Sequence, residues 1–345
     1  MKHKNFLVTG GMGFIGSNFI RHLLKYPETK VINIDNLSDG SCVENLNDLE
    51  DNDRYTFIKK CIKSENFEEI FKKFDIDCLV HFAAESHVDR SIESPESFIN
   101  TNIFGTFNLL NASLKFQEYK NTFHFHHVST DEVFGSLTKK CDPFNEDNQY
   151  KPNSPYSASK AASDHLVRAW HKTFKLNTTT SNCSNNFGPY QFPEKLIPLI
   201  ILNALKGEKI PIYGDGMNIR DWLYVEDHCD GILKIIDNGV LGETYNIGGD
   251  NEKDNITIIN KVCEILESIA PLSEPSPLTG KKLNIKNYFE LKSFVEDRKG
   301  HDFRYSISSK KIMEELNWYP QVNFENGMLK TIKWYVENID WLKDK

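Results

Sequence analysis

The 345-residue sequence has no long apolar run. Its longest apolar stretch, residues 196–205, is interrupted by Pro198 and Asn203 and is too short to span a bilayer. No signal-peptide pattern precedes the first expected strand, because a glycine-rich turn already begins at Gly10. We therefore expect no membrane association.

A cysteine framework and net positive charge are also missing. The seven cysteines are scattered, odd in number and without a C-x-x-C pair, which predicts reduced thiols in a cytoplasmic protein. The formal net charge of −8 argues against a nucleic-acid partner. An anionic substrate would need a local basic pocket.

The chain is large enough for a sizeable core and alternates strand and helix patterns in its first half. A hydrophobic fraction of 39% and a charged fraction of 26% are typical of globular proteins. Short apolar runs separated by helical periodicity indicate βαβ units and a parallel sheet. We expect strands at 5–9, 31–35, 56–62, 78–82 and 123–130, and helices at 14–26, 67–74, 97–116 and 154–174.

A glycine-rich turn follows the first expected strand and opens the first helix. Its sequence, residues 9–16, contains G-x-G-x-x-G, whose glycines allow a tight turn and close approach to a pyrophosphate at the helix N-terminus. An ordinary glycine turn is the alternative. Asp35 ends the next strand, and its carboxylate suits free ribose hydroxyls and would repel a 2′-phosphate. The turn therefore predicts NAD rather than NADP.

The second half is less regular. After about Asn182 the alternation weakens and prolines punctuate the chain, and a Pro/Ser-rich stretch at 270–282 predicts a surface loop. The predicted fold class is α/β, a Rossmann-type doubly wound parallel sheet with a smaller C-terminal α/β substrate domain. Residues 1–183 would form the NAD-binding domain, to which the chain returns near 214–240, and residues 184–345 would mainly bind the substrate.

Tyr156 and Lys160 lie four residues apart on an expected helix and so share a face. A cation at this distance is expected to lower the pKa of the phenol, which lets Tyr156 act as a base. The alternative is a surface pair. The position of the pair, one βα unit after a strand that ends at Thr130, favours the catalytic interpretation.

Two adjacent carboxyls, Asp131 and Glu132, follow the end of that strand, where open parallel sheets bind ligands. Adjacent carboxyls are usually a solvated turn, but the apolar continuation to Gly135 favours a pocket. An elimination needs one protonated carboxyl to donate to a leaving hydroxyl and one ionised carboxyl to take a proton. The sequence supplies both and leaves their assignment open.

Cationic and amide side chains of the second half suggest a diphosphate site. Arg220 has a fork that matches two phosphate oxygens, and Arg298 and His301 lie in a short polar segment that could close over the same ligand. For each residue alone a surface salt bridge is the alternative. The run His124 to His127 could suggest a metal, but no further ligand cluster accompanies it, so we expect strand packing and no metal.

In this order the motifs resemble the extended short-chain dehydrogenase/reductases, and among them the dTDP-glucose 4,6-dehydratases. The resemblance runs over nearly the whole chain and rests on residues 83–91, 129–135, 156–170, 182–199, 212–228 and 245–249. The epimerases and decarboxylases of the superfamily lack the Asp-Glu pair. The resemblance implies NAD-dependent loss of water from dTDP-glucose, giving dTDP-4-keto-6-deoxy-glucose, and a homodimer that packs two helices of each subunit, here 97–116 and 154–174.

The resemblance also implies roles for individual residues. Tyr156, helped by Lys160 and Thr130, would deprotonate the O4 hydroxyl, Glu132 would take the C5 proton and Asp131 would protonate the departing C6 hydroxyl. The implied cofactor contacts are Gly10, Gly13, Phe14, Ile15, Gly16, Asp35, Asn36, Cys61, Ile62, Ala83, Ala84, Thr101, Tyr156, Lys160 and Asn186. The implied substrate contacts are Ser86, Thr130, Asn185, Lys195, Leu196, Pro211, Tyr213, Arg220, Asn255, Arg298 and His301.

The chain departs from the family pattern near the adenosine. Cys61 stands where the family usually has an aspartate that reads the adenine amino group, and a thiol is a poor acceptor. The segment 37–42 also differs from the usual one and lacks its aromatic residue. These departures predict weaker NAD retention.

Three alternatives stay open at this point. A nucleotide-sugar 4-epimerase would use Tyr156 and NAD and would tolerate loss of both carboxyls. A nonenzymatic NAD-binding protein would be expected to have a degraded catalytic set. Within the dehydratases, UDP-glucose is an alternative substrate, because one base methyl is worth only about 1–3 kcal/mol of discrimination in an apolar pocket.

Overall fold

The computed structural model describes residues 1–297 and 300–343. Its main element is a seven-stranded parallel sheet in the order β10-β6-β5-β4-β1-β2-β3. This order confirms the predicted doubly wound fold, because the chain winds outward in both directions from β1. The strands are β1 (Asn5–Thr9), β2 (Lys30–Asp35), β3 (Tyr55–Lys59), β4 (Cys78–His81), β5 (His124–Thr130), β6 (Thr178–Cys183) and β10 (Thr244–Ile247).

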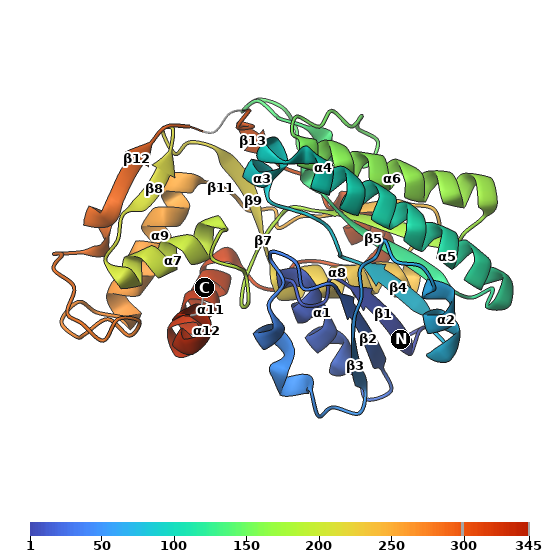
Figure 1. Cartoon of the computed structure of the whole chain (residues 1–345). Helices are drawn as coiled ribbons and strands as arrows, with labels where there is room; N and C mark the ends of the chain where they lie inside the picture. The colour runs from blue at the N-terminus through green and yellow to red at the C-terminus, as the bar shows by residue number, and fades with distance from the viewer. Residues whose placement is uncertain (298–299, 344–345) are drawn as a thin grey trace.

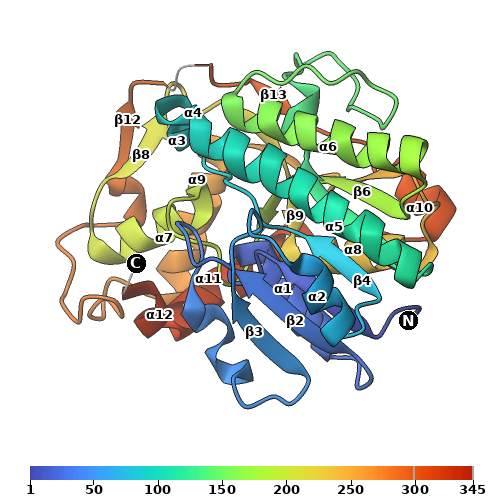
Figure 2. The same cartoon turned by 45° about the vertical axis from the view of Figure 1, so that its right-hand side comes forward.

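Helices cover both faces of this sheet (Figure 1). Successive side chains of β1 show why: Phe6 and Val8 pack into the cluster under one face, and Leu7 into the cluster under the other. The first face carries α1 (Phe14–Leu24) and α8 (Val225–Asn238). The second carries α2 (Phe67–Lys73), α5 (Thr106–Tyr119) and α6 (Pro155–Phe174), and Figure 2 shows α5 and α6 side by side.

The long helix expected at 97–116 is composite. It consists of α4 (Pro95–Phe98), a π-helical stretch η2 (Ile99–Gly105) and α5, preceded by the short α3 (Val88–Glu93). At Gly105 a Cβ would lie 2.4 Å from the Cδ1 of Ile62, so the missing side chain allows the helix to approach the turn after β3. The expected strand 56–62 ends at Lys59, which leaves Cys61 and Ile62 in that turn.

The remaining elements form a second layered unit beside the carboxyl edge of the sheet. β9 (Ile219–Tyr224) pairs with β7 (Asn185–Phe187), β11 (Glu252–Asp254) and β13 (Arg304–Tyr305), while β8 (Ile210–Tyr213) pairs with β12 (Lys292–Val295). Around them pack the helices α7 (Leu196–Lys206), α9 (Asn255–Ile269), α11 (Phe324–Glu337) and α12 (Ile339–Lys343) and the 3-10 turn η4 (Tyr288–Leu291). Three further elements belong to the large sheet: the 3-10 turn η1 (Val43–Leu49) packs on α1, the 3-10 turn η3 (Asp131–Phe134) follows β5, and α10 (Lys310–Leu316) packs on α8 and β10.

The two units are joined by the last turns of the chain. The indole of Trp341 in α12 donates to Oδ1 of Asn45, which lies in η1 beside α1, at 2.9 Å. The expected surface loop at 270–282 has no helix or strand, yet Ser276 and Leu278 are buried against α7. Among the described residues, no helix combines the length and apolar character needed to cross a membrane.

Candidate active site

Two adjoining cavities, of about 310 and 200 Å³, lie at the carboxyl ends of the central strands. The first is at the switch point between β1 and β4, where the winding of the sheet reverses and ligands bind in folds of this kind. The second lies between this edge and the second unit. Ser86, Glu132 and Asn185 line both, so the two cavities adjoin.

The glycine-rich turn lines the first cavity. Gly10 has a positive φ of 72°, and a Cβ there would lie 2.7 Å from the amide nitrogen of Ala83. A Cβ at Gly16 would lie 2.3 Å from the carbonyl oxygen of Gly10. The first turn of α1 holds no acidic residue and no side-chain cap, which leaves its N–H groups available to an anion.

Asp35 lies at the end of β2 and lines the same cavity. Its Oδ2 accepts from the amide of Met12 at 3.0 Å, and its Oδ1 accepts from the amide of Leu37 and the hydroxyl of Ser41, each at 2.8 Å. These donors hold the carboxylate beside the turn. A ribose hydroxyl would meet a fixed acceptor there, whereas a 2′-phosphate would meet a negative charge.

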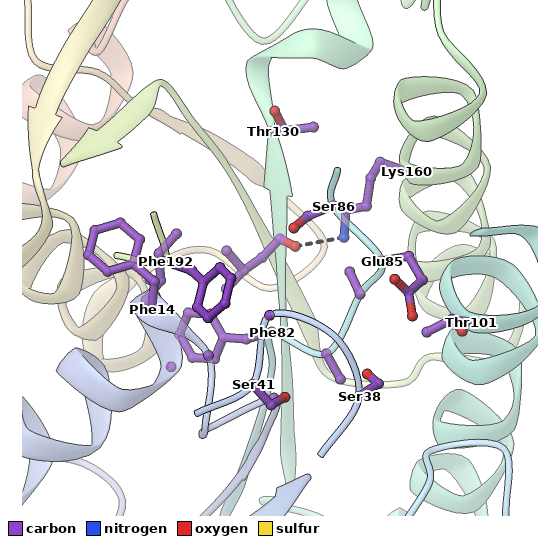
Figure 3. A pocket seen from close by; sticks show the side chains of 18 of the residues that line it. Phe14, Ser38, Ser41, Phe82, Glu85, Ser86, Thr101, Thr130, Lys160 and Phe192 are labelled. Atoms are coloured by element: carbon purple, nitrogen blue, oxygen red, sulfur yellow. Dashed lines mark hydrogen bonds between the residues drawn. The ribbon is translucent and has the colours of Figure 1, made fainter. Parts of the chain in front are cut away.

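The first cavity therefore fits a dinucleotide with an adenosine end and a reactive end. Figure 3 shows Ser38 and Ser41 at one end, Phe14, Phe82 and Phe192 gathered along one side, and Lys160 and Thr130 at the other end. All the residues expected to contact the cofactor line it: Gly10, Gly13, Phe14, Ile15, Gly16, Asp35, Asn36, Cys61, Ile62, Ala83, Ala84, Thr101, Tyr156, Lys160 and Asn186.

Tyr156 and Lys160 face the reactive end from α6. The helix begins with a capping box between Ser154 and Ser157, which fixes the first turn, and Tyr156 lies in that turn. Lys160 Nζ donates to the carbonyl of Val128 in β5 at 2.9 Å (Figure 3, dashed line). Both side chains are buried.

The expectation that Lys160 lowers the pKa of Tyr156 is wrong for the protein alone. Burial, followed by the charge of Glu132, raises the pKa of Tyr156 well above its ordinary value, and a hydrogen bond with Thr130 opposes the rise. Burial also lowers the pKa of Lys160. The sequence shows the spacing of the two side chains but not how completely the fold removes them from water.

Asp131 and Glu132 form the first residues of η3, directly after β5. The carboxyl of Asp131 is 3% exposed, and its Oδ2 has no hydrogen-bond partner within the described chain. Burial, the charge of Glu132 and the charge of Asp221 raise the pKa of Asp131 well above its usual range. Glu132 is half-buried and lines both cavities. The pair thus offers a protonated carboxyl beside a more accessible one.

The second cavity brings together nearly all of the expected substrate contacts. It is lined by Ser86, Asn185, Lys195, Leu196, Pro211, Tyr213, Arg220, Asn255 and His301, while Thr130 lines the first cavity. Arg298 lies outside the described residues.

Two cations of this set are held in place by backbone carbonyls. Lys195 Nζ donates to the carbonyl of Ser86 at 3.1 Å. Arg220 donates to the carbonyls of Ile219 and Asp302 at 2.7 and 3.0 Å and lies over the ring of Tyr305 at 4.4 Å. The second cavity therefore presents two fixed positive charges in a protein of formal net charge −8.

The histidines of β5 pack inside the sheet. His124 and His126 share a strand face, as expected, and both contact the hydroxyl of Thr179 at 2.8 Å. Burial lowers the pKa of His124 to about 3. Across the described ranges, 1–297 and 300–343, no group of three or more His, Cys, Asp or Glu side chains could hold a metal ion.

Several cavity residues escaped the sequence analysis. Most of them lie within the motif segments but were not identified as contacts, and they include Phe82, Glu85, Cys183, Gln191, Phe192 and Glu194 in the first cavity and Trp222, Asp302 and Tyr305 in the second. Asp164 was also missed, although it repeats the four-residue spacing of Tyr156 and Lys160. That spacing is the one signal that could have found it.

A dinucleotide turn at the switch point, followed by a Tyr/Lys pair at the reactive end, defines a short-chain dehydrogenase/reductase of the extended type. Residues 7–331 match the model of the family described as GDP-mannose 4,6 dehydratase. A dTDP-glucose 4,6-dehydratase of Neisseria meningitidis is 49% identical over 345 residues, which cover 98% of this chain and 95% of that protein.

Solved structures agree with the sequence matches. The dTDP-glucose 4,6-dehydratase of Bacillus anthracis, solved in complex with NAD, has a TM-score of 0.85 and 41% identity over 99% of both chains. That of Streptomyces venezuelae, with NAD and TYD bound, has a TM-score of 0.85 and 40% identity over 98% of both. The chain belongs to the dTDP-glucose 4,6-dehydratase family.

Proposed function

We propose that this chain is a hydro-lyase that converts dTDP-glucose to dTDP-4-keto-6-deoxy-glucose, with NAD as its resident cofactor. The observation that carries the proposal is the Asp131–Glu132 pair at the junction of the two cavities. A protonated carboxyl with one oxygen left without a hydrogen bond in the described chain is suited to expel a hydroxyl as water, and a simple dehydrogenase or epimerase has no use for it. The names of its relatives support dTDP-glucose over UDP-glucose.

The residues that line the first cavity would hold NAD, which would supply the hydride acceptance at C4 of the glucose and the hydride return to C6. The protein's own contribution to the first half is a proton transfer. Tyr156 would take the O4 proton, Thr130 would hold the phenol by its hydrogen bond, and Lys160 would supply the positive charge behind it. Because burial disfavours the phenolate, Tyr156 is an effective base only while positive charge is close to it.

The two carboxyls would perform the elimination. A C4 ketone acidifies the C5 hydrogen, and Glu132, which lines both cavities, would take that proton. Asp131, kept protonated by its burial, would donate to the departing C6 hydroxyl. Water is then the leaving group, and a proton returns to C5.

The remaining cavity residues would bind the two ligands. The turn at Gly10 to Gly16 would hold the pyrophosphate of NAD, and Asp35 the adenosine ribose. Arg220 and His301 would face the diphosphate of the nucleotide sugar. In this proposal residues 1–183 with the returning segment bind NAD, and residues 184–345 mainly bind the sugar nucleotide.

We also propose a cytoplasmic homodimer that packs α5 and α6 against their copies. Large apolar side chains are exposed on these helices and on η2, which precedes α5: Ile99, Phe104, Phe107 and Phe174 are between 42% and 56% exposed. Such a density of exposed apolar side chains favours a protein interface. A second copy of this chain is the proposed occupant. The free cysteines in the described part of the chain suit a reducing compartment.

The test compares Asp131→Asn with Glu132→Gln on dTDP-glucose in deuterated water. Loss of a general acid or base is expected to slow dehydration about 10²–10⁴-fold in each variant. Asp131→Asn should still exchange the C5 hydrogen for deuterium, because Glu132 is intact, whereas Glu132→Gln should not. Unimpaired turnover in both variants would contradict the proposal, and a C4-epimerised product would favour the epimerase.

A further inference from the structure

A third buried ionisable side chain follows Tyr156 and Lys160 on the same face of α6. Asp164 repeats their four-residue spacing and is 6% exposed. The three side chains thus form one stripe that faces β5 and β6. Nothing in the dehydration chemistry requires a carboxylate at this depth, below the lysine and away from both cavities.

Neutral donors surround the carboxylate of Asp164. Its Oδ1 lies 3.1 Å from His127 Nε2, and its Oδ2 accepts from the hydroxyl of Ser129 at 2.9 Å. A hydrogen bond with Tyr150 adds a third donor. Burial raises the pKa of Asp164 to about 6, and the positive charge of Lys160 is the strongest opposing influence. Asp164 is therefore ionised at neutral pH.

Burial shifts the pKa of Lys160 in the opposite direction to that of Asp164. Its ammonium is buried, which lowers its pKa, and Asp164 is the first influence that raises it again. The groups that act on Lys160 are Asp164 on its own helix and the thiol of Cys183 on β6. His127 on β5 and His81 on β4 face it as well, and burial keeps both imidazoles neutral because it lowers their pKa values far below the usual range. The carboxylate in this set is Asp164.

His127 lies between the two charges. Its Nε2 is 3.1 Å from Asp164 Oδ1 and 3.5 Å from Lys160 Nζ. A neutral imidazole cannot both donate to the carboxylate and accept from the ammonium at one nitrogen. The shorter distance favours an Nε2–H of His127 that donates to Asp164. One N–H of the Lys160 ammonium donates instead to the carbonyl of Val128 at 2.9 Å. The imidazole thus separates the charges while keeping both in one low-dielectric site.

We propose that Asp164 is a positioning residue that keeps Lys160 protonated and aimed at the reactive end of the first cavity. The proposal rests on the proposed function, because Lys160 matters only if Tyr156 must lose its proton there. A charged lysine beside Tyr156 is what makes the buried phenol a usable base, and a neutral lysine would not. Tyr156, Lys160 and Asp164 then form one electrostatic unit along α6.

The first experiment follows unfolding rather than activity. It compares wild type, Asp164→Asn, Lys160→Met and the double variant, without added nucleotide, by urea unfolding between pH 7 and 9.5. In Asp164→Asn the folded chain is expected to hold Lys160 neutral while the unfolded chain keeps it charged. Unfolding then takes up a proton, so stability should rise with pH more steeply than in wild type. The double variant should lose that extra rise.

Parallel pH dependences of wild type and Asp164→Asn would overturn the proposal, whether or not dTDP-glucose is turned over. The second readout is the pH profile of kcat/KM for dTDP-glucose. Its alkaline limit should move down by about 1–3 pH units in Asp164→Asn, because the lysine loses its proton earlier. The control Tyr150→Phe removes one hydrogen bond of Asp164 without changing its charge and should keep the alkaline limit. An equal shift in both variants would indicate a merely structural role and overturn the proposal.

A third measurement covers the case in which Asp164→Asn does not fold. Wild type labelled at lysine 13Cε, with Lys160→Met for assignment, reports the charge of Lys160 directly by NMR. The proposal predicts an ammonium at pH 8. A neutral amine at that pH would overturn it.

Discussion

At the residue scale, Asp131 shows how a buried side chain with a proposed catalytic role can reduce the stability of the fold. The side chain is 3% exposed with one oxygen unpartnered, and its pKa is raised well above the usual range. Asp221, in contrast, is buried but accepts from the amides of Gly249 and Asn251 at 2.8 and 2.7 Å. An aspartate oxygen thus lacks a hydrogen bond at Asp131, where catalysis is proposed, whereas both oxygens of Asp221 accept hydrogen bonds from the loop that they hold.

This difference predicts opposite stability effects for one substitution. The unfolded chain ionises Asp131 near pH 4, whereas the folded chain resists ionisation, so Asp131 destabilises the fold increasingly as pH rises above 4. Asp131→Asn should therefore raise the free energy of unfolding by about 0.5–2 kcal/mol at pH 8, with a smaller gain at pH 5. Urea unfolding at both pH values measures this.

Asp221→Asn is the matched control and should destabilise the protein, because its amide NH₂ would oppose one of the two backbone donors. A loss of stability in Asp131→Asn at pH 8 would contradict the assignment of Asp131 as a protonated carboxyl.

Cys61 is the second residue-scale prediction. It lines the adenosine end of the first cavity, in the turn after β3. Because a carboxylate accepts hydrogen bonds far better than a thiol, Cys61→Asp should tighten NAD binding about tenfold. Isothermal titration of the nucleotide-free protein measures it, and Cys61→Asn is the uncharged control of equal shape. Equal affinities in wild type and Cys61→Asp would show that Cys61 does not face the adenine.

At the element scale, the loop after β2 is tied across the first cavity to the loop before α7. Arg90 in α3 contacts Asp39 at 3.1 Å and Glu194 at 2.6 Å, and both carboxylates line the cavity. The Asp39 side chain is 79% exposed, whereas that of Glu194 is 16% exposed. The Arg90–Glu194 pair is therefore better shielded from water and salt than the Arg90–Asp39 pair.

The exposure of the two pairs predicts unequal effects on the release of NAD. Asp39→Asn should speed release less than about fivefold, because exposed ion pairs contribute at most about 1 kcal/mol. Arg90→Met should speed it more, since it removes both pairs and leaves Glu194 without its strongest neighbour. Stopped-flow displacement of NAD measures both rates. Equal rates of NAD release in the two variants would contradict a larger contribution from the Arg90–Glu194 ion pair.

The sequence predicted these elements unevenly, for physical reasons. The first-half strands and helices were found because their apolar periodicity is local. Gly10, Asp35 and Tyr156 followed from fixed positions within one element or between two neighbouring elements. Asp302 and Tyr305 were missed because β13 reaches the second cavity by pairing with β9, and the paired residues are 85 positions apart in the chain. The direction of the pKa shift of Tyr156 was predicted wrongly because burial depends on the whole fold, which a local spacing does not show.

At the scale of the whole molecule, the proposed dimer brings a test of its own. Phe104 on the π-helical stretch before α5 is 56% exposed, and Phe294 on β12, which lies in the second unit, is 65% exposed. Phe104→Glu should shift the protein to monomers, because a charge would be buried between two copies. Phe294→Glu, at a somewhat more exposed position on another element, should leave the dimer intact. Sedimentation velocity distinguishes the two, and an unchanged dimer in Phe104→Glu would exclude this face.

The central claim joins the two cavities into one reaction, and one measurement tests it most directly. Purified protein is given dTDP-glucose and NAD, and the product mass and the absorbance of NADH are followed together. The account predicts that the sugar nucleotide loses one water while no net NADH accumulates. A product of unchanged mass with inverted C4, or NADH formed in step with the product, would contradict it.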